Sequence, residues 1–324
     1  MVEASTPSSA GIEMGKKKRF LLVDLVIRLV REKPLGTVGG VIVLMLFFTG
    51  IFANLLAPYG FNEIVLADRL NPPSAAHWLG TDNLGRDLLS RIINGARISM
   101  IVSLAASTLA TTLYILVGVT SGYFGGKFDL ILQRFVDAIM SMPTLIFLLS
   151  VMAILGPGMM QVILVMGIHR GLGSGARTTR SAVIRIKEDM YFEAAKAIGA
   201  KNLRILARHV LPNIMPVIII QFTLNMGALI LSEAQLSFLG FGIPPPFPSW
   251  GGMLSGSGRQ YMLQAPWMLL WPGLALFMVV YGINMLGDAV RDLLDPRLRG
   301  GLGRYGGMTQ EKLAKLAEKK IAAR

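Results

Sequence analysis

The sequence predicts an all-α polytopic membrane protein with six transmembrane helices and both termini in the cytoplasm. Of the 324 residues, 53% are hydrophobic and only 16% are charged, whereas a soluble domain carries about 25% charged residues. Apolar runs of about 20 residues recur along the chain, and a helix of that length spans a hydrocarbon layer of about 30 Å. The runs are continuous and do not alternate, which argues against a β-barrel.

Residues 1–35 are expected to form a cytoplasmic tail with an interfacial helix. A basic cluster at 16–19 followed by apolar residues imitates a signal peptide. However, Asp24 and Arg28 interrupt the apolar part, and no small-residue cleavage site follows. We therefore expect this segment to be retained and to lie at the membrane surface.

Six spans follow from the apolar runs and from the prolines and glycines that bound them. They are expected at 36–57, 98–120, 130–155, 159–175, 214–231 and 266–286. Two long polar segments, 58–97 and 232–265, fall on one side of the membrane. The chain is thereby divided into the tail, a first span with its outer segment (36–97), a core of five helices (98–290) and a basic tail (291–324).

The distribution of Lys and Arg sets the orientation. The segments on the side of the termini hold 27 of the 32 basic residues, and the opposite loops hold five. Cytoplasmic loops carry the excess of basic residues, so the termini are expected in the cytoplasm. The same bias explains the net charge of +13, and nucleic acid is not expected as a partner.

Residues 189–213 form a polar, basic interruption that predicts a helix–glycine–helix elbow on the cytoplasmic side. The first helix is expected to have an apolar face formed by Tyr191, Ala194, Ala195 and Ile198. Gly199 stands where a C-terminal cap belongs, Asn202 can cap the second helix, and Pro212 is expected to end it. The second apolar face should consist of Leu203, Leu206, Ala207 and Val210. Such an elbow can dock its apolar face in a partner's groove.

The spacing within this elbow resembles the EAA loop of ABC importer permeases. The residues that carry the resemblance are Glu193, Ala194, Ala195, Gly199, Leu211 and Pro212. In that family the loop is the coupling helix that inserts into the ATP-hydrolysing subunit. The resemblance therefore implies that these six residues couple the chain to an ATPase. His209 stands where the family usually has an aliphatic residue.

Motifs outside the elbow resemble a narrower branch, the second permease subunit of di/oligopeptide and nickel importers. They lie at 79–82 with 85–87, 95–99, 121–126, 234–240, 248–251, 286–288, 291–292 and 295–297. The resemblance covers about residues 35–299 and implies a type I ABC importer permease fold, with its transmembrane core at 98–290, in the inner (cytoplasmic) membrane.

The same resemblance implies a function and a set of partners. The chain would form half of the translocation pathway for di/oligopeptides or a similar small solute. Besides the lipid membrane, its partners would be a homologous permease subunit, two ABC ATPase subunits and an extracytoplasmic substrate-binding protein. Dipeptide, oligopeptide, glutathione, nickel chelate and a sugar-like solute all stay open as substrates, as does the role of the segment at 80–87.

The sequence predicts no catalytic centre, metal site or bound cofactor in this chain, so ATP hydrolysis is assigned to separate subunits. Gly126 and Lys127 imitate part of a P-loop, but Ser121 replaces its first glycine and Phe128 replaces the residue that binds Mg²⁺. The three histidines fall in three separate segments. With no cysteine, the chain can form neither a thiolate nucleophile nor a cysteine metal site.

The alternative from another class is a secondary carrier or channel that acts alone. Such a carrier needs buried acids or broken helices near the midplane, and the expected spans hold few charges, among them Asp137 and Glu233 near span ends. These two acids could line a substrate path, or they could pair or snorkel. Gln221 and Asn225, four residues apart on one helix face, are the predicted polar lining of a translocation pathway.

Overall fold

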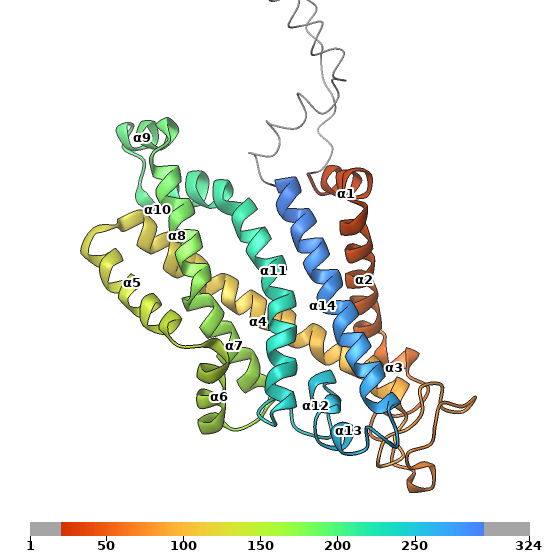
Figure 1. Cartoon of the computed structure of the whole chain (residues 1–324). Coiled ribbons are helices and arrows are strands. Elements are labelled where there is room, and N and C mark those ends of the chain that lie inside the picture. The colour runs from red at the N-terminus through yellow and green to blue at the C-terminus, as the bar shows by residue number, and fades with distance from the viewer. Residues whose placement is uncertain (1–20, 295–324) are drawn as a thin grey trace, which may run out of the picture.

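The computed structural model describes residues 21–294, and helices make up most of that part of the chain (Figure 1). The helices are α1 (Leu21–Glu32), α2 (Pro34–Ile51), α3 (Ala53–Leu56), η1 (Leu66–Asp68), α4 (Leu88–Phe124), α5 (Gly126–Ser141), α6 (Thr144–Leu155), α7 (Met159–Leu172), α8 (Ser174–Lys187), α9 (Met190–Ala197), α10 (Asn202–Ile205), η2 (Leu206–Val210), α11 (Leu211–Phe238), α12 (Trp250–Leu254), α13 (Gly256–Gln260) and α14 (Trp267–Leu294). Within the described residues, an isolated bridge between Thr81 and Asp87 is the only β pairing. The all-α prediction is confirmed.

Four of the described helices are long and apolar enough to cross a membrane. They are α2, α4, the continuous helix Asn202–Phe238 and α14. A fifth crossing is available if α5 and α6, which meet at 91°, count as one broken span. The class of polytopic membrane protein is thus confirmed, and the exact number of six crossings stays a prediction.

The second predicted span was placed ten residues too late. Helix α4 begins at Leu88 because Asp87 caps it, accepting a hydrogen bond of 2.8 Å from the Ser90 N–H. Its first turns carry buried polar residues, among them Asn94 and Arg91, and Arg91 donates a hydrogen bond to the Phe61 carbonyl of the segment 57–87. Because these residues are polar, the sequence predicted a loop where the helix begins.

The third and fourth predicted spans are both interrupted. Pro143 separates α5 from α6 because it lacks an N–H and keeps Met142 in an extended conformation (φ −90°, ψ 135°). The fourth span ends at Leu172, and Gly173 (φ −93°, ψ −128°) interrupts the helix before the polar helix α8. The fifth and sixth spans are longer than predicted, reaching Phe238 and Leu294.

The predicted N-terminal tail contains the helix α1, which packs against α2 and α14. Lys33 then joins α2 to α14 through an ion pair of 2.5 Å with Asp292. The basic cluster at 16–19 and residues 295–324 of the predicted basic tail lie outside the described residues. No structural observation bears on the predicted domain boundaries as such.

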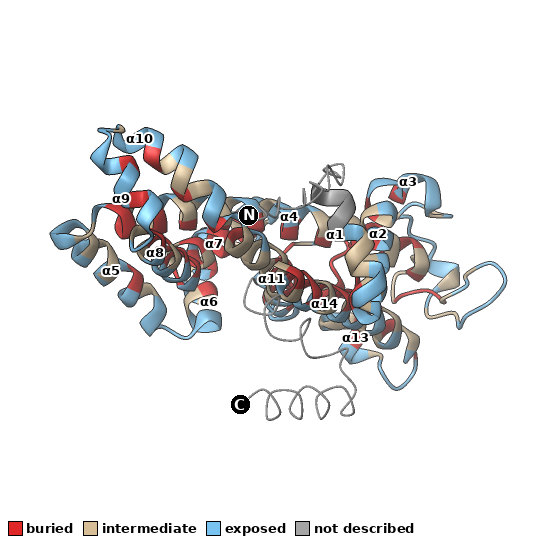
Figure 2. Ribbon diagram, turned by 90° about the horizontal axis from the view of Figure 1, so that it is seen from above, coloured by how far each residue is buried: buried red, intermediate tan, exposed pale blue. Residues whose placement is uncertain are grey.

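The helices pack closely because glycines face their neighbours. A Cβ atom at Gly118 in α4 would lie 2.6 Å from the carbonyl oxygen of Ala176 in α8, and one at Gly39 in α2 would lie 2.4 Å from that of Gly282 in α14. Small residues of this kind let transmembrane helices approach each other. Figure 2 shows buried residues where helices meet and exposed residues on the outward faces. Exposed large apolar side chains such as Leu44 suit contact with lipid.

The two ends of the molecule differ in what they carry. In Figure 1 the helices α9, α10 and α1 and the last turn of α14 lie at one end. The segment 57–87 and helices α12 and α13 lie at the other end. The elbow, α1 and the last turn of α14 are therefore on the same side of the bundle.

Candidate functional site

The predicted elbow exists, and Gly199 forms its turn. Gly199 has φ +74°, a left-handed conformation that glycine adopts without strain. Its N–H donates to the Lys196 carbonyl at 2.9 Å, and the next N–H, of Ala200, donates to the Ala195 carbonyl at 3.2 Å. These two bonds make a Schellman motif at the end of α9, so the predicted cap is confirmed.

The two apolar faces that the sequence predicted are divided between the inside and the surface of the elbow. In α9 the buried residues are Phe192 and Ala195, which is 4% exposed. They join Ile205, Val210 and Tyr123 in one hydrophobic cluster. Ala195 therefore supports the elbow from inside, while Glu193 and Ala194 lie on its surface.

Three large apolar side chains project from the elbow into solvent. Met190 is 88% exposed, Ile198 84% and Leu203 78%. Lys196, Lys201 and Arg204 are exposed beside them. Ile198 and Leu203 belong to the apolar faces that the sequence predicted to dock in a partner's groove. A surface with this much unburied apolar area and a basic surround fits a groove on another protein.

The second half of the elbow is attached to α4. Lys201 is the N-cap of α10 and makes no side-chain cap, so the predicted cap by Asn202 is wrong. Instead, Asn202 Oδ1 accepts a hydrogen bond of 2.8 Å from the hydroxyl of Tyr123. Lys187 Nζ donates to the carbonyl oxygens of Gly122 and Tyr123 at 3.3 and 2.9 Å. The last turn of α4 thus holds both sides of the elbow.

Pro212 does not end the helix, contrary to the prediction. Residues Asn202–Phe238 form one continuous helix, in which Leu206–Val210 is a π-helical turn. A proline inside a helix lacks an N–H and clashes with the carbonyl one turn earlier, and a π-turn accommodates that misfit. Leu211 and Pro212 consequently lie where the elbow becomes the span.

The predicted lining residues lie further along the same helix. Gln221 and Asn225 are both half-buried. Gln221 Nε2 is buried and has no hydrogen-bond partner among the described residues. An unpaired group of this kind is costly inside a protein, and atoms of this chain cover it in the present conformation.

The isolated acids and histidines have partners or aromatic contacts. Asp137 forms an ion pair with Arg177 of α8, and Glu233, which is buried, is bonded by the Ser237 hydroxyl at 2.6 Å. His169 packs on Phe147 with ring centroids 4.8 Å apart. Among the described residues there is no group of His, Cys, Asp and Glu that could hold a metal ion.

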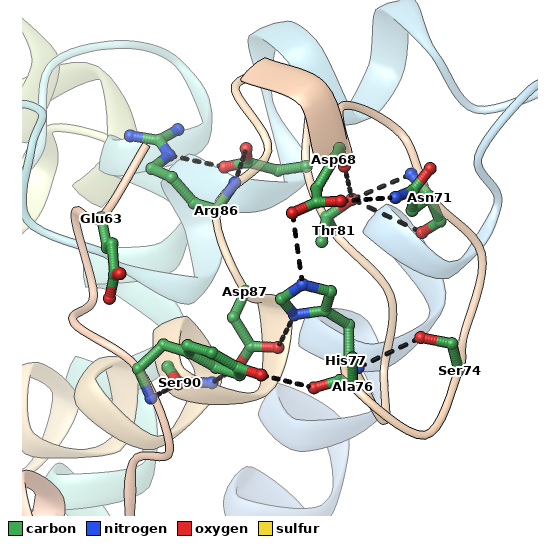
Figure 3. A network of polar contacts seen from close by, with 12 residues as sticks. Glu63, Asp68, Asn71, Ser74, Ala76, His77, Thr81, Arg86, Asp87 and Ser90 are labelled. Atoms are coloured by element: carbon green, nitrogen blue, oxygen red, sulfur yellow. Dashed lines mark hydrogen bonds and ion pairs between the residues drawn. The ribbon is translucent and has the colours of Figure 1, made fainter. Parts of the chain in front are cut away.

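The segment at 80–87 forms the hub of a polar network at the opposite end of the molecule (Figure 3). Asp82 accepts hydrogen bonds from the N–H groups of Leu84 and Arg86, at 2.8 and 3.0 Å, and from Arg86 Nε at 2.7 Å. Arg91 Nε lies 3.6 Å from the same carboxylate. His77 contacts Asp87 at 3.0 Å. The sequence showed the motif but not that it folds back onto α4.

A family model matches most of this architecture. The model of the binding-protein-dependent transport system inner membrane component matches residues 114–300, more than half of the chain, and includes the elbow. The chain belongs to this family. A second model, the N-terminal TM domain of oligopeptide transport permease C, matches residues 22–73.

Relatives of known name agree with the family. The chain is 40% identical to the dipeptide transport system permease protein DppC of Alkalihalophilus pseudofirmus, over 83% of this chain and 88% of that protein. It is 36% identical to the oligopeptide transport system permease protein OppC of Bacillus subtilis, over 92% and 97%. It is 38% identical to the glutathione transport system permease protein GsiD of Pectobacterium atrosepticum, over 83% and 89%.

One solved structure shows the fold. A chain of the inward-facing MetNI methionine ABC transporter matches with a TM-score of 0.51 and 18% identity, covering 63% of this chain and 96% of that one. The type I ABC importer permease fold implied by the resemblance is thus confirmed. This family member is a permease component of the inner membrane rather than an enzyme.

Proposed function

We propose that this protein is one of the two permease halves of an ATP-driven importer of di/oligopeptides or a similar small solute. Its relatives are named as permeases for dipeptides, oligopeptides and glutathione, which are all peptides. An extracytoplasmic binding protein delivers the solute, and two separate ABC ATPase subunits hydrolyse ATP. No cofactor is held by this chain. The other half of the pathway is a homologous permease subunit.

The proposal rests mainly on the geometry of the elbow. It presents Met190, Ile198 and Leu203 to solvent and continues without a break into a membrane span. A groove of the ATPase subunit that closes around these side chains would move them as one body with the following helix. ATP then shifts the permease between conformations to the extent that the ATPase pair prefers one of them.

The arrangement proposed for the membrane has six crossings with both termini in the cytoplasm. The crossings are α2, α4, α5 with α6, α7 with α8, the helix Asn202–Phe238, and α14. Support comes from the common end at which α1, the elbow and the last turn of α14 lie (Figure 1) and from the basic residues concentrated there. Gln221 and Asn225 would then face the solute at the boundary between the two permease halves.

The proposal is tested by purifying the tagged chain in mild detergent and identifying the subunits that accompany it. We expect a second, homologous permease and two P-loop ATPases, and ATP hydrolysis that rises when binding protein and peptide are added. A chain that purifies alone, together with peptide uptake that persists without any ATPase and follows an ion gradient, would overturn the proposal in favour of a secondary carrier.

A further inference from the structure

A cavity of about 400 Å³ opens at the end of the molecule opposite the elbow. Its wall combines the start of α4, the segment 80–87 and the loop between α11 and α14. The charged residues that line it are Asp82, Arg86 and Arg91. A cavity of this size is within the range that accepts small ligands.

Arg86 and Arg91 carry two positive charges and Asp82 carries one negative charge, so these three groups have a net charge of +1. Both guanidinium groups are directed at Asp82, whose two oxygens already accept three hydrogen bonds. Arg91 Nε lies 3.6 Å from Asp82 Oδ2, so it forms an ion pair with this carboxylate but no hydrogen bond. The side chains of Arg86 and Arg91 are only 11% and 9% exposed. An unbalanced cation so far from bulk water attracts an anion strongly.

Donor groups remain available on both arginines. Arg86 Nη1 lies 3.4 Å from Asn62 Oδ1, and Arg91 Nη1 donates to the Phe61 carbonyl at 3.0 Å. Within the described part of the chain, the Nη2 atoms of the two residues form no hydrogen bond. Figure 3 shows the terminal nitrogens of Arg86 pointing away from the polar network. An arginine fork of this kind matches a carboxylate.

Among the described residues, no acid other than Asp82 lines the cavity. Asp87 is engaged by Ser90 and His77. Glu233 is not part of the wall, and Ser237, which is, directs its hydroxyl to Glu233. The rest of the wall is formed by glycine, serine, proline and apolar residues. The wall as a whole is therefore cationic.

An apolar cavity of about 230 Å³ adjoins this site. The two cavities share Ile243, Pro244 and Phe247 as a common wall, and the second is otherwise lined mainly by apolar groups. A ligand with a carboxylate at one end and an apolar group next to it would match the pair. A peptide with a free C-terminal carboxylate has this chemistry.

We propose that the cavity binds the carboxylate of a peptide-like solute through Arg86 and Arg91 before the solute enters the membrane. This inference rests on the proposed function, which places this end of the chain outside the cell, where the binding protein releases its load. The segment at 80–87 thereby acquires a role: Asp82 positions the two arginines, and they hold the anion.

The test uses the purified full-length chain in lipid nanodiscs and a tripeptide that carries a photoreactive diazirine leucine. The tripeptide is supplied either as the free acid or as the C-terminal amide, and mass spectrometry locates the crosslinks. We expect the free acid to label residues 240–257 about tenfold more than the amide, because charge-assisted hydrogen bonds are lost with the amide. Arg86→Gln should reduce labelling by the acid to the level of the amide.

Arg69→Gln is the matched control, because Arg69 is an exposed arginine at the same end that bonds Tyr261 and does not line the cavity. It should leave labelling unchanged. If Arg86→Gln is not recovered folded, Ser257→Phe fills the cavity without removing a charge and should lower labelling by the acid. Equal labelling by acid and amide, or full labelling of either folded variant, would overturn the inference. Neither result would alter the co-purification of ATPases, so the two proposals fail separately.

Discussion

The hydroxyl of Tyr123 lies 2.8 Å from Asn202 Oδ1 and connects the last turn of α4 to the first residue of α10. The ring of Tyr123 also packs edge-on against Phe192 of α9, with centroids 6.1 Å apart. Its carbonyl accepts a hydrogen bond from Lys187. One residue of α4 thus contacts both halves of the elbow. A displacement of the elbow should therefore also displace the last turn of α4.

Tyr123→Phe should weaken coupling without unfolding the protein. The change removes one hydrogen bond, worth about 1 kcal/mol, and Asn202 is exposed enough to bond water instead. We expect the ratio of peptide uptake to ATP hydrolysis in the reconstituted complex to fall by up to about fivefold. Tyr59→Phe, which removes a hydroxyl bonded to the Ala76 carbonyl, is the control. An unchanged ratio for Tyr123→Phe would exclude this contact from coupling.

Substitutions at Gly199 should act through the backbone: a side chain strains its conformation, and proline also removes the N–H that donates to the Lys196 carbonyl. A Cβ atom there meets nothing within 4 Å, so the cost arises from φ +74° and is about 1–2 kcal/mol for an ordinary residue. Gly199→Val and Gly199→Pro should uncouple hydrolysis from uptake, and Gly199→Asn, which tolerates this conformation, should retain coupling. Gly156→Val, at φ +79° with equal space, should lower stability without changing the ratio. Equal coupling in all four variants would contradict a role for the turn.

The exposed side chains of the elbow should decide ATPase attachment. Ile198→Asp and Leu203→Asp place a charge on a surface that we expect to be buried by the partner, and each should sharply reduce the ATPase that co-purifies. The variants should fold normally because both positions are exposed. Leu263→Asp, at an 89% exposed leucine of the opposite end, should have no effect.

A bulky residue at Ala195 should also uncouple ATP hydrolysis from uptake. The reason is different, because the larger side chain overpacks the buried cluster and destabilises the elbow by about 1–3 kcal/mol.

Asp82→Ala should destabilise the end of the chain opposite the elbow. It would leave two buried guanidinium groups without their carboxylate, and such a loss costs about 3–5 kcal/mol. We expect a lower thermal unfolding temperature in detergent and faster proteolysis within 57–87. Asp68→Ala removes a partly exposed carboxylate 3.9 Å from His77 and should have a smaller effect. Similar losses for the two variants would mean that Asp82 is not the hub.

The predicted lining can be probed because the chain has no cysteine of its own. Gln221→Cys and Asn225→Cys should react with a membrane-impermeant maleimide in the reconstituted complex, and peptide should slow the reaction. Thr223→Cys lies about 200° around the helix from Gln221 and should react slowly. Faster labelling at 223 than at 221 would place the pathway on the other helix face.

The position of the elbow could be predicted from sequence, but not its orientation. Gly199 and the change from apolar to basic residues are local signals, and the structure confirms the turn. Which face is buried depends on Tyr123, more than 60 residues earlier in the chain, and eight residues of periodicity cannot distinguish the side of Phe192 from that of Ile198. The π-turn before Pro212 is likewise invisible, because a proline in a sequence usually marks the end of a helix.

The polar network around residues 80–87 also depends on tertiary contacts that the sequence does not reveal. The motif at 80–87 could be recognised, and the polarity of residues 88–97 predicted a loop. Burial of Arg91 became possible only because residues 57–87 fold over it and supply a carboxylate and a carbonyl, whereas Asn94 bonds the Ser90 carbonyl of its own helix. The start of α4 is therefore set by tertiary contacts in addition to the cap at Asp87.

Helix α4 has 37 residues and so measures about 55 Å at about 1.5 Å per residue, nearly twice the hydrocarbon thickness of about 30 Å. It runs obliquely across the bundle (Figure 1). Arg91 stands in its first turn and Tyr123 in its last. Such a rod acts as a lever: a tilt of about 10° about its midpoint displaces its two tips by about 5 Å in opposite directions. Binding of a solute outside the cell and closure of the ATPases inside it would then be coupled through the tilt of this one helix.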